Sequence, residues 1–351
     1  MEILEKVPLA PLTTLRVGGS ARYFIEALSI GEAQEAVAFS RSRDLPLFVL
    51  GGGSNVVIAD SGFPGLVLKI SILGIEQRSG HDGRGRIVFD VGAGEPWDRF
   101  VSRAVVAHCA GVECLSGIPG SVGGTPVQNV GAYGQEVGET TASVQVLDVK
   151  DGQVHELDPE ACQFGYRSSI FNRSGRGRYI VLGVSYALIP DGKPRLDYAD
   201  LKRHFAGRES KPNLAETREA VRHIRALKGM LIVPGEQEAF SAGSFFKNPL
   251  LTHEQHQDLE RRAAARRLTV PSYPALQTQK KVSAAWLVER SGFAKGHGFG
   301  PVGISSKHAL ALVNRGGAST ADILALKDQI QQRVEEIWGV HLQMEPVLVG
   351  F

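Results

Sequence analysis

A serine stands in the stretch AGSFFKNP, residues 242–249, after a glycine and before two phenylalanines. A serine hydrolase presents its nucleophile on a strained turn of the form G-x-S-x-G, with a base nearby. Phe246 occupies the position of the last glycine, so Ser244 does not fit a nucleophile of this kind. From the residues alone, Ser244 is a turn or helix-cap serine, or a hydroxyl with another chemical role.

Glycines form three clusters in the first half of the chain: GGGSN from Gly51, GAGEPW from Gly92, and residues 117–134. Glycine accounts for 41 of 351 residues, roughly 12% against a usual ~7%. Because glycine has no Cβ and tolerates positive φ, such loops can turn backbone N–H groups towards an anion. They contain no lysine or arginine, so a bound pyrophosphate would depend on main-chain dipoles and the hydroxyls of Ser54, Ser121 and Thr125.

Each glycine cluster, taken alone, can be explained as a tight turn that binds no ligand. The stretch GAGEPW also lacks the third glycine of the dinucleotide fingerprint G-x-G-x-x-G, which disfavours a Rossmann domain.

Metal and disulfide sites are not expected. The three cysteines, Cys109, Cys114 and Cys162, form no C-x-x-C pair. The stretch HEQH at residues 253–256 is one residue shorter than the zinc motif H-E-x-x-H. A solvated histidine pair is the simpler interpretation.

The composition is that of a globular protein of two or three domains, with 43% hydrophobic residues. A net charge of +2 gives no basis for binding nucleic acid or an anionic membrane. The start of the chain does not resemble a secretory signal, and no segment reaches the about 18 apolar residues of a membrane span. We therefore expect a cytoplasmic protein.

The elements that must position these residues follow from hydrophobic patterns. Short β-branched runs predict strands at residues 21–28, 45–53, 65–70, 85–94, 141–157 and 178–189, with a hairpin turn at 150–153, and a final strand within 342–351. Helices are predicted at residues 30–43, 97–110 with Gly111 just past the end, 215–229, 251–268 and 319–339. Because strands and helices mix without regular βαβ alternation, the fold class is α+β.

The last helix has the clearest pattern. Ser319 and Asp322 are spaced like a capping box. The positions expected on its buried side are Ile323, Leu326, Ile330, Val334 and Ile337.

Nine stretches together resemble one family, the UDP-N-acetylenolpyruvoylglucosamine reductases of bacterial peptidoglycan synthesis. They are TTLRVGGSARYF, LGGGSNVVIAD, VGAGEPWDRFV, GIPGSVGGTPVQNVGAYGQEV, GYRSSIF, SAGSFFKNP, SAAWLVERSGFAKG, KHALALVN and MEPVLVG. The resemblance runs from about residue 10 to residue 351. The stretch LDYADL around Tyr198 resembles the branch of the family with an extra tyrosine-bearing loop.

The resemblance implies a non-Rossmann FAD fold of the vanillyl-alcohol-oxidase type. Its two α+β subdomains would be residues 1–71 and 72–212, followed by a substrate-binding α+β domain at 213–351 whose last strand returns to the active site. It also implies that NADPH reduces FAD, and that the flavin then reduces the enolpyruvyl group of a UDP-sugar to the lactyl ether of UDP-N-acetylmuramate. The expected oligomeric state is a monomer.

The resemblance assigns roles to three residues. Arg167 would hold the substrate carboxylate, and its planar fork suits a group that gains charge. Ser244 would give a proton to the enolate carbon. Glu345 would lie near the enolate and, to help there, would need a pKa raised by burial. Without the resemblance, Arg167 is equally a structural salt-bridge partner, and Glu345 is a surface glutamate at a strand end.

Two further sets are carried over from the family. The cofactor set is Gly51, Gly52, Gly53, Ser54, Asn55, Gly92, Gly94, Ile118, Pro119, Gly120, Ser121, Gly123, Gly124, Thr125, Asn129, Gly131, Ala132 and Tyr133. The substrate set is Tyr166, Tyr198, Arg225, Lys228, Asn248 and His308. Arg225 and Lys228 are three residues apart and would share one helix face, which without the family would be a solvated helix end.

Three alternatives stay open. An FAD-dependent oxidase of the same fold, acting on sugars or hydroxy acids, often tethers its flavin through a histidine or cysteine, and these loops contain no histidine. A flavin- or nucleotide-binding protein without turnover would have no use for a proton donor. A Rossmann dehydrogenase lacks its third glycine.

Overall fold

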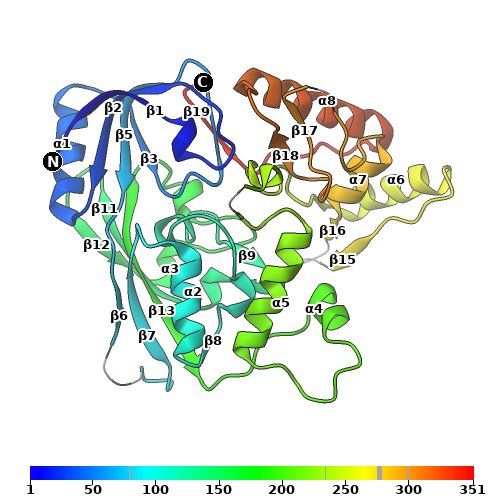
Figure 1. The fold of residues 1–351 in the computed structure, drawn as a ribbon, viewed down its shortest axis with the longest axis horizontal. Helices are drawn as coiled ribbons and strands as arrows, with labels where there is room; N and C mark the ends of the chain where they lie inside the picture. The colour runs from blue at the N-terminus through cyan, green and yellow to red at the C-terminus, as the bar shows by residue number, and fades with distance from the viewer. Residues whose placement is uncertain (79, 81, 234, 275–278, 299) are drawn as a thin grey trace. The chain divides into compact units, whose positions relative to one another are not determined.

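In the computed structural model the described residues are 1–78, 80, 82–233, 235–274, 279–298 and 300–351. They form two compact units, coloured along the chain in Figure 1. Unit 1 comprises Met1–Val7, Ala21–Gly53 and Phe63–Leu227, and unit 2 comprises Pro8–Ser20, Ser54–Gly62 and Lys228–Phe351. These bounds differ from the three subdomain ranges of the sequence analysis, which stay a prediction.

Unit 1 contains a four-stranded sheet near the N-terminus. Its order is β1 (Leu4–Pro8), β2 (Ser20–Ala27), β5 (Phe63–Ile70) and β3 (Leu47–Leu50). Both β2 and β3 pair with β5 in parallel. The helix α1 (Ile30–Ser42) contacts β5 and begins at Ser29, whose hydroxyl accepts from the backbone N–H of Glu32. The strand predicted at 45–53 ends at Leu50, because a glycine loop begins at Gly51.

A second, mostly antiparallel sheet completes unit 1. Its order is β12 (Val154–Leu157), β11 (Thr141–Asp148), β13 (Tyr179–Pro190), β7 (Ile87–Gly92) and β6 (Ile75–Gln77), with β8 (Cys109–Ala110) on the far end of β13. The predicted hairpin at 150–153 is confirmed as the connection between β11 and β12. The helix α2 (Trp97–Val106) packs its aromatic side chains against the core of this sheet, where Phe100 stacks on Tyr186 with ring centroids 4.8 Å apart.

The sequence prediction of a helix over 97–110 is wrong at its end. The helix stops at Val106, because His108 adopts a φ of +55° and the next two residues pair with β13. The remaining elements of unit 1 are short strands β9 (Gly131–Ala132) and β10 (Gln135–Glu136), helices α3 (Pro159–Cys162), α4 (Ala199–His204) and α5 (Leu214–Leu227), and 3-10 helices at Glu113–Leu115, Val122–Gly124, Val137–Glu139 and Ile170–Asn172.

Unit 2 is built from helices and short strand pairs. Its strands are β4 (Val56–Ile58), β14 (Leu250–Leu251), β15 (Ser272–Pro274), β16 (Lys280–Val282), β17 (Val302–Ile304), β18 (Leu312–Asn314) and β19 (Val347–Val349). Its helices are α6 (His253–Ala264), α7 (Ala284–Arg290) and α8 (Thr320–Trp338), with 3-10 turns at Ala10–Leu12 and Gln237–Ala239. The pairing of β19 with β4 is parallel, and it joins the C-terminal strand to an N-terminal segment.

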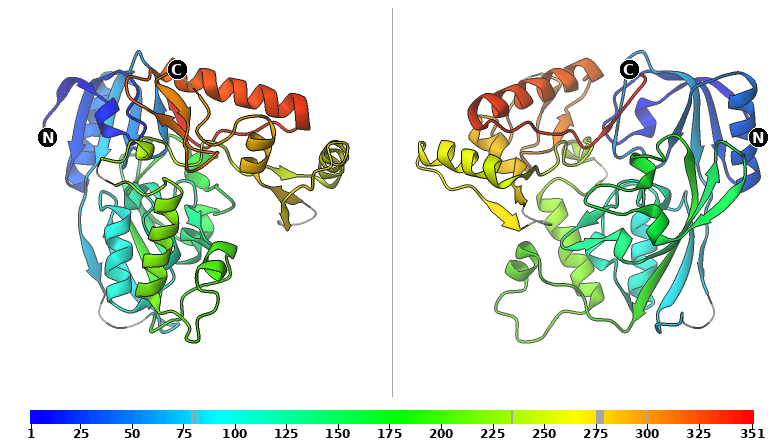
Figure 2. Two further views of the ribbon diagram at one scale, coloured as in Figure 1. Left: turned by 45° about the vertical axis from the view of Figure 1, so that its right-hand side comes forward. Right: turned by 180° about the vertical axis from the view of Figure 1, so that it is seen from behind.

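The helix α8 confirms the predicted capping box, since Ser319 and Asp322 bond reciprocally. Figure 2 shows α8 beside β17 and β18, which it contacts. The first four predicted core positions are buried, but Ile337 is only half-buried and Trp338 takes the last core position. None of the helices in the described residues has the length and apolar content that crossing a lipid bilayer requires.

Candidate active site

Two glycine loops of unit 1 meet backbone to backbone. A Cβ on Gly52 would lie 2.5 Å from the Gly120 Cα, and one on Gly51 would lie 2.9 Å from the Ser121 Oγ. Real Cβ atoms do not approach other atoms this closely, so only glycine fits at Gly52 without movement of the backbone. Segments about 70 residues apart in sequence therefore form one cradle, which we call the glycine cradle: Gly51–Gly53 with Gly120–Thr125.

The hydroxyl of Ser121 is the unusual group in this cradle. Ser121 is 7% exposed, and its Oγ has no hydrogen-bond partner among the described residues. Because buried hydroxyls in folded proteins are nearly always paired, this oxygen indicates a group that the cradle receives. A Cβ on the neighbouring Gly124 would meet no atom within 4 Å, so the cradle is open there. Main-chain amides, an unpaired hydroxyl and open space fit a phosphate-containing cofactor such as FAD.

Other residues of the expected cofactor set have structural tasks. A Cβ on Gly92 would lie 2.3 Å from the Ile72 carbonyl oxygen, and one on Gly94 would lie 2.5 Å from the Ser71 Cα. Thr125 is committed within the protein, since its hydroxyl donates to the Val122 carbonyl at 2.8 Å and lies 2.7 Å from the Tyr186 hydroxyl. Backbone packing therefore accounts for these two glycines. Among the described residues of unit 1, Ser121 has the buried hydroxyl without a hydrogen-bond partner.

Tyr133 lies at the tip of the hairpin formed by β9 and β10, where it and Gly134 have positive φ values of 48° and 88°, as in a type I′ turn. The ring of Tyr198 packs edge-on against it, with centroids 5.3 Å apart. Burial raises the pKa of the Tyr133 hydroxyl to about 12, although the nearby Arg225 guanidinium opposes this rise. The tyrosine-bearing segment thus contacts the hairpin expected to bind cofactor.

Arg225 is 8% exposed, and its Nε donates to the Gly117 carbonyl at 3.1 Å. Burial lowers its pKa, while Tyr133 acts in the opposite direction. Lys228 lies beyond the last residue of α5, Leu227, so the two cations expected on one helix face are a helical residue and a turn residue.

An ionic network that the sequence analysis missed supports this region. Asp98 pairs with Arg218 and with Arg222, each at 2.6 Å, and accepts from the Gly117 backbone N–H at 2.6 Å. Burial raises the pKa of Asp98, but the Arg218 hydrogen bond and the Gly117 N–H outweigh it and hold the pKa below its ordinary value. The network ties α2, α5 and the start of the 117–134 glycine segment together. The i, i+4 spacing of the two arginines was visible in the sequence, but their common partner was not.

Arg167 lies in a tight turn of unit 1, where its Nη2 donates to the Gly131 carbonyl at 2.8 Å. Its guanidinium carbon is 5.9 Å from the ring centre of Tyr166. The predicted carboxylate-binding arginine and the GAYG hairpin are therefore in direct contact.

In unit 2, Ser244 and Glu345 lie on adjacent antiparallel segments. The Glu345 N–H donates to the Phe245 carbonyl and the Lys247 N–H to the Gln343 carbonyl, both at 2.9 Å. Gly243 precedes Ser244 with a φ of +69°, a left-handed conformation that suits glycine. Ser244 is half-buried.

Asn55, expected to contact the cofactor, lies against this pair of segments. Its carbonyl accepts from the Val347 N–H at 3.0 Å, and its Nδ2 donates to the Glu345 carbonyl at 3.4 Å. The parallel pairing of β4 with β19 thus brings an N-terminal glycine-cluster residue to the C-terminal glutamate.

The other expected substrate residues of unit 2 occupy turns and caps. Asn248 Oδ1 accepts from the Ala284 N–H at 2.9 Å, at the start of α7. His308 Nδ1 accepts from the Leu310 N–H at 3.0 Å. Lys228 precedes Gly229, whose Cβ position would be 3.3 Å from Lys307 Cδ, so the Lys228 and His308 segments are neighbours.

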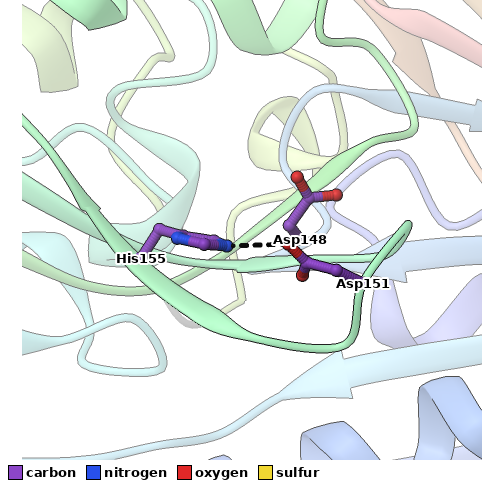
Figure 3. A group of neighbouring side chains, drawn as sticks. All are labelled: Asp148, Asp151 and His155. Carbon is purple, nitrogen blue, oxygen red and sulfur yellow. Dashed lines mark hydrogen bonds and ion pairs between the residues drawn. The ribbon is translucent and has the colours of Figure 1, made fainter.

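Two groups with metal-ligand residue types have structural explanations. Asp148, Asp151 and His155 gather at the β11–β12 turn (Figure 3), where His155 Nε2 lies 3.1 Å from Asp151 Oδ2. Arg178 Nε donates to Asp148 at 2.8 Å, so a cation already neutralises this carboxylate. In α6, His253 is exposed but His256 is only 6% exposed, so the solvated histidine pair expected from the sequence is wrong for His256.

Comparisons with known proteins agree with this geometry. Family models match residues 21–158, as an FAD binding domain, and residues 235–349, as the C-terminal domain of UDP-N-acetylenolpyruvoylglucosamine reductase. A UDP-N-acetylenolpyruvoylglucosamine reductase of Thermobifida fusca is 45% identical, covering 99% of this chain and 98% of the relative. One of Streptomyces coelicolor is 44% identical, covering 99% of this chain and 90% of the relative.

Among solved structures, UDP-N-acetylenolpyruvylglucosamine reductase from Thermus caldophilus covers 99% of both chains, with 26% identity and a TM-score of 0.66. The similarity spans both units. The α+β fold with an FAD-binding domain that the sequence analysis expected is confirmed.

Proposed function

The chain belongs to the UDP-N-acetylenolpyruvoylglucosamine reductase family, and we propose that it reduces the enolpyruvyl group of a UDP-sugar to the lactyl ether of UDP-N-acetylmuramate. The substrate is an enol ether conjugated to a carboxylate. Hydride addition at its terminal carbon leaves negative charge on the adjacent carbon and the carboxylate. The protein must therefore stabilise an enolate and then protonate it.

FAD, when bound, supplies the hydride chemistry. The glycine cradle would hold its pyrophosphate through main-chain amides and Ser121, with Ile118 and Pro119 beside it. The unpaired Ser121 hydroxyl and the open space at Gly124 support this assignment. Ser54 and Asn55 stay predicted cofactor contacts.

Arg167 would bind the substrate carboxylate. A planar guanidinium offers two parallel donors, and its attraction grows as charge moves onto the carboxylate. Its anchorage to the Gly131 carbonyl supports a fixed orientation.

Ser244 would protonate the enolate carbon. A hydroxyl is a weak acid, but an enolate carbon is basic enough to accept its proton, so no activating base is required. Glu345 on the adjacent segment would act as a hydrogen-bond donor in its protonated form. The antiparallel backbone contact between these two segments is the single observation that carries the proposal, because it supports a common location for two of the three proposed groups.

The nucleotide part of the substrate would be bound by Tyr198, Arg225, Lys228, Asn248 and His308, and Tyr166 would also contact the substrate. NADPH would be the reductant, and NADPH and the UDP-sugar would occupy the same site in turn. Parallel double-reciprocal lines are expected from such a ping-pong scheme, and intersecting lines would contradict it. A cytoplasmic location, a monomeric state and the three subdomain ranges remain predictions of the same scheme.

The purified holoenzyme provides the test. It should be yellow, bleach anaerobically with NADPH and recolour when UDP-N-acetylglucosamine enolpyruvate is added. Bleaching by a sugar or hydroxy acid, with no recolouring by the enolpyruvyl sugar, would instead indicate the oxidase alternative. Many such oxidases hold their flavin covalently. Release of the flavin on mild denaturation would therefore favour the reductase over the oxidase alternative.

A further inference from the structure

The backbone of Arg167 is in an unusual conformation. Its φ is +52°, in the left-handed region that side chains with a Cβ disfavour. The turn that contains it is closed by backbone hydrogen bonds between Gly165 and Ser168, at 2.9 and 3.1 Å. Such a conformation persists only where its surroundings hold it. The groups that hold this turn therefore decide where the guanidinium points.

Asn129 is the first of these groups. It is 2% exposed, and its Nδ2 donates to the Gly165 carbonyl at 3.0 Å and to Glu136 Oε2 at 2.7 Å. Its Oδ1 accepts from the Gly138 N–H at 2.9 Å. One buried amide thus joins the arginine turn to the hairpin that accepts the Arg167 guanidinium. Because this amide is committed to protein partners, a contact of Asn129 with FAD would come from its main chain.

Asn172 is the second group. Its Nδ2 donates to the Arg167 carbonyl at 3.1 Å, directly at the left-handed residue. Its Oδ1 separately accepts from the Ser169 N–H at 3.0 Å and caps the short helix Ile170–Asn172. The two bonds use different atoms, so a substitution can remove one and keep the other.

We propose that Asn129 and Asn172 are positioning residues that orient Arg167 for the oxidative half-reaction, in which the UDP-sugar is reduced. The inference rests on the proposed role of Arg167. Neither asparagine touches the reacting atoms in this scheme. Both act on the arginine turn, Asn129 through the Gly165 carbonyl and Asn172 through the Arg167 carbonyl.

The sharper test is Asn172→Asp, which keeps the capping acceptor and loses the donor to the Arg167 carbonyl. The reduction of FAD by NADPH should be unchanged, while reoxidation by the enolpyruvyl UDP-sugar should slow roughly tenfold or more, since small misplacements of a binding group are costly in rate. Asn213→Asp is the matched control: Asn213 Oδ1 accepts from the Glu216 N–H at 2.9 Å at another helix start. This control should behave as wild type in both half-reactions.

The second test is Asn129→Asp, which places a carboxylate beside Glu136. At neutral pH it should slow the oxidative half-reaction. Lowering the pH should reduce the deficit only in part, because two adjacent carboxylates raise the pKa of one of them. The proton relieves the repulsion from Glu136, but the bond to the Gly165 carbonyl stays lost. The same pH series on Asn213→Asp provides the baseline.

The possible results distinguish an error in the proposed role of Arg167 from an error in the positioning role of the two asparagines. If Arg167→Lys leaves the oxidative half-reaction intact, the proposed role of Arg167 is wrong. If Arg167→Lys slows it but Asn172→Asp and Asn129→Asp do not, the positioning inference alone is overturned. Loss of bound flavin in either asparagine variant, or equal slowing of both half-reactions, would also overturn it. If Asn129→Asp does not fold, Asn172→Asp decides the question.

Discussion

The backbone N–H of Glu345 donates to the carbonyl oxygen of Phe245 at 2.9 Å, one residue after Ser244. Main-chain hydrogen bonds thereby hold a glutamate near the C-terminus beside the FFKN segment, independently of the conformation of the glutamate side chain. The rings of Phe245 and Phe246 are buried, with centroids 5.7 Å apart, and they anchor the same segment. The position of the Ser244 main chain is therefore set by backbone hydrogen bonds and by its buried neighbours.

Ser121→Ala should weaken FAD binding without harming the protein that lacks FAD. Removing a buried hydroxyl that has no partner among the described residues costs the apoprotein no hydrogen bond. The FAD complex would lose one bond, worth about 1 kcal/mol or roughly fivefold in Kd. Titration of the apoprotein with FAD and a urea unfolding curve without FAD would measure the two effects.

Thr125→Val is the contrasting variant for this measurement. The Thr125 hydroxyl bonds to Val122 and Tyr186, so its loss should lower the free energy of unfolding by about 1–2 kcal/mol, with or without FAD. Equal effects of the two variants on FAD affinity would show that Ser121 has no special relation to the cofactor.

Gly52→Ala should disrupt the glycine cradle. Its Cβ would lie 2.5 Å from the Gly120 Cα, a clash with backbone that rotamer changes cannot relieve. We expect a loss of about 1–3 kcal/mol in stability, together with a lower flavin content. Gly124→Ala is the control for stability, since its Cβ would meet no atom within 4 Å. Equal stability of the two variants would contradict the observed contact between the loops.

Asp98→Asn should destabilise the protein in a pH-dependent manner. The pKa of Asp98 is below its ordinary value in the folded state. Its stabilisation is therefore fully present above the unfolded pKa, about 3.9, and disappears as the pH falls through the lower folded value. The difference in unfolding free energy between wild type and variant should be about 2 kcal/mol at neutral pH and should shrink below about pH 4. Urea unfolding at several pH values would measure it, and a difference independent of pH would contradict the assignment.

The sequence predicted those structural features that depend on residues close together in the chain. The Ser319 and Asp322 capping box and the apolar spacing of α8 depend on neighbours within a few residues, and both were found. The end of α2 was missed because it is set by pairing of Cys109 and Ala110 with a distant strand. Trp338, and not the predicted Ile337, fills the last core position of α8. Side-chain packing decides this, and the spacing of apolar residues alone does not.

The candidate site divides in the same way. Glycine clusters marked the cradle, but the reason for glycine differs by position: Gly52 permits contact with another loop, whereas Gly92 makes room for the Ile72 carbonyl. The left-handed turn of Arg167 and the buried amide of Asn129 depend on contacts between segments separated in sequence. No periodicity in the sequence indicates such contacts.

The most direct test of the proposed chemistry is the pair of anaerobic half-reactions of Ser244→Ala, with Ser42→Ala, an exposed helix serine, as the control. If Ser244 protonates the enolate carbon, the variant should be bleached by NADPH at the wild-type rate and reoxidised by the enolpyruvyl UDP-sugar about a hundredfold or more slowly. Reoxidation at the wild-type rate, or equal slowing of both steps, would contradict the account.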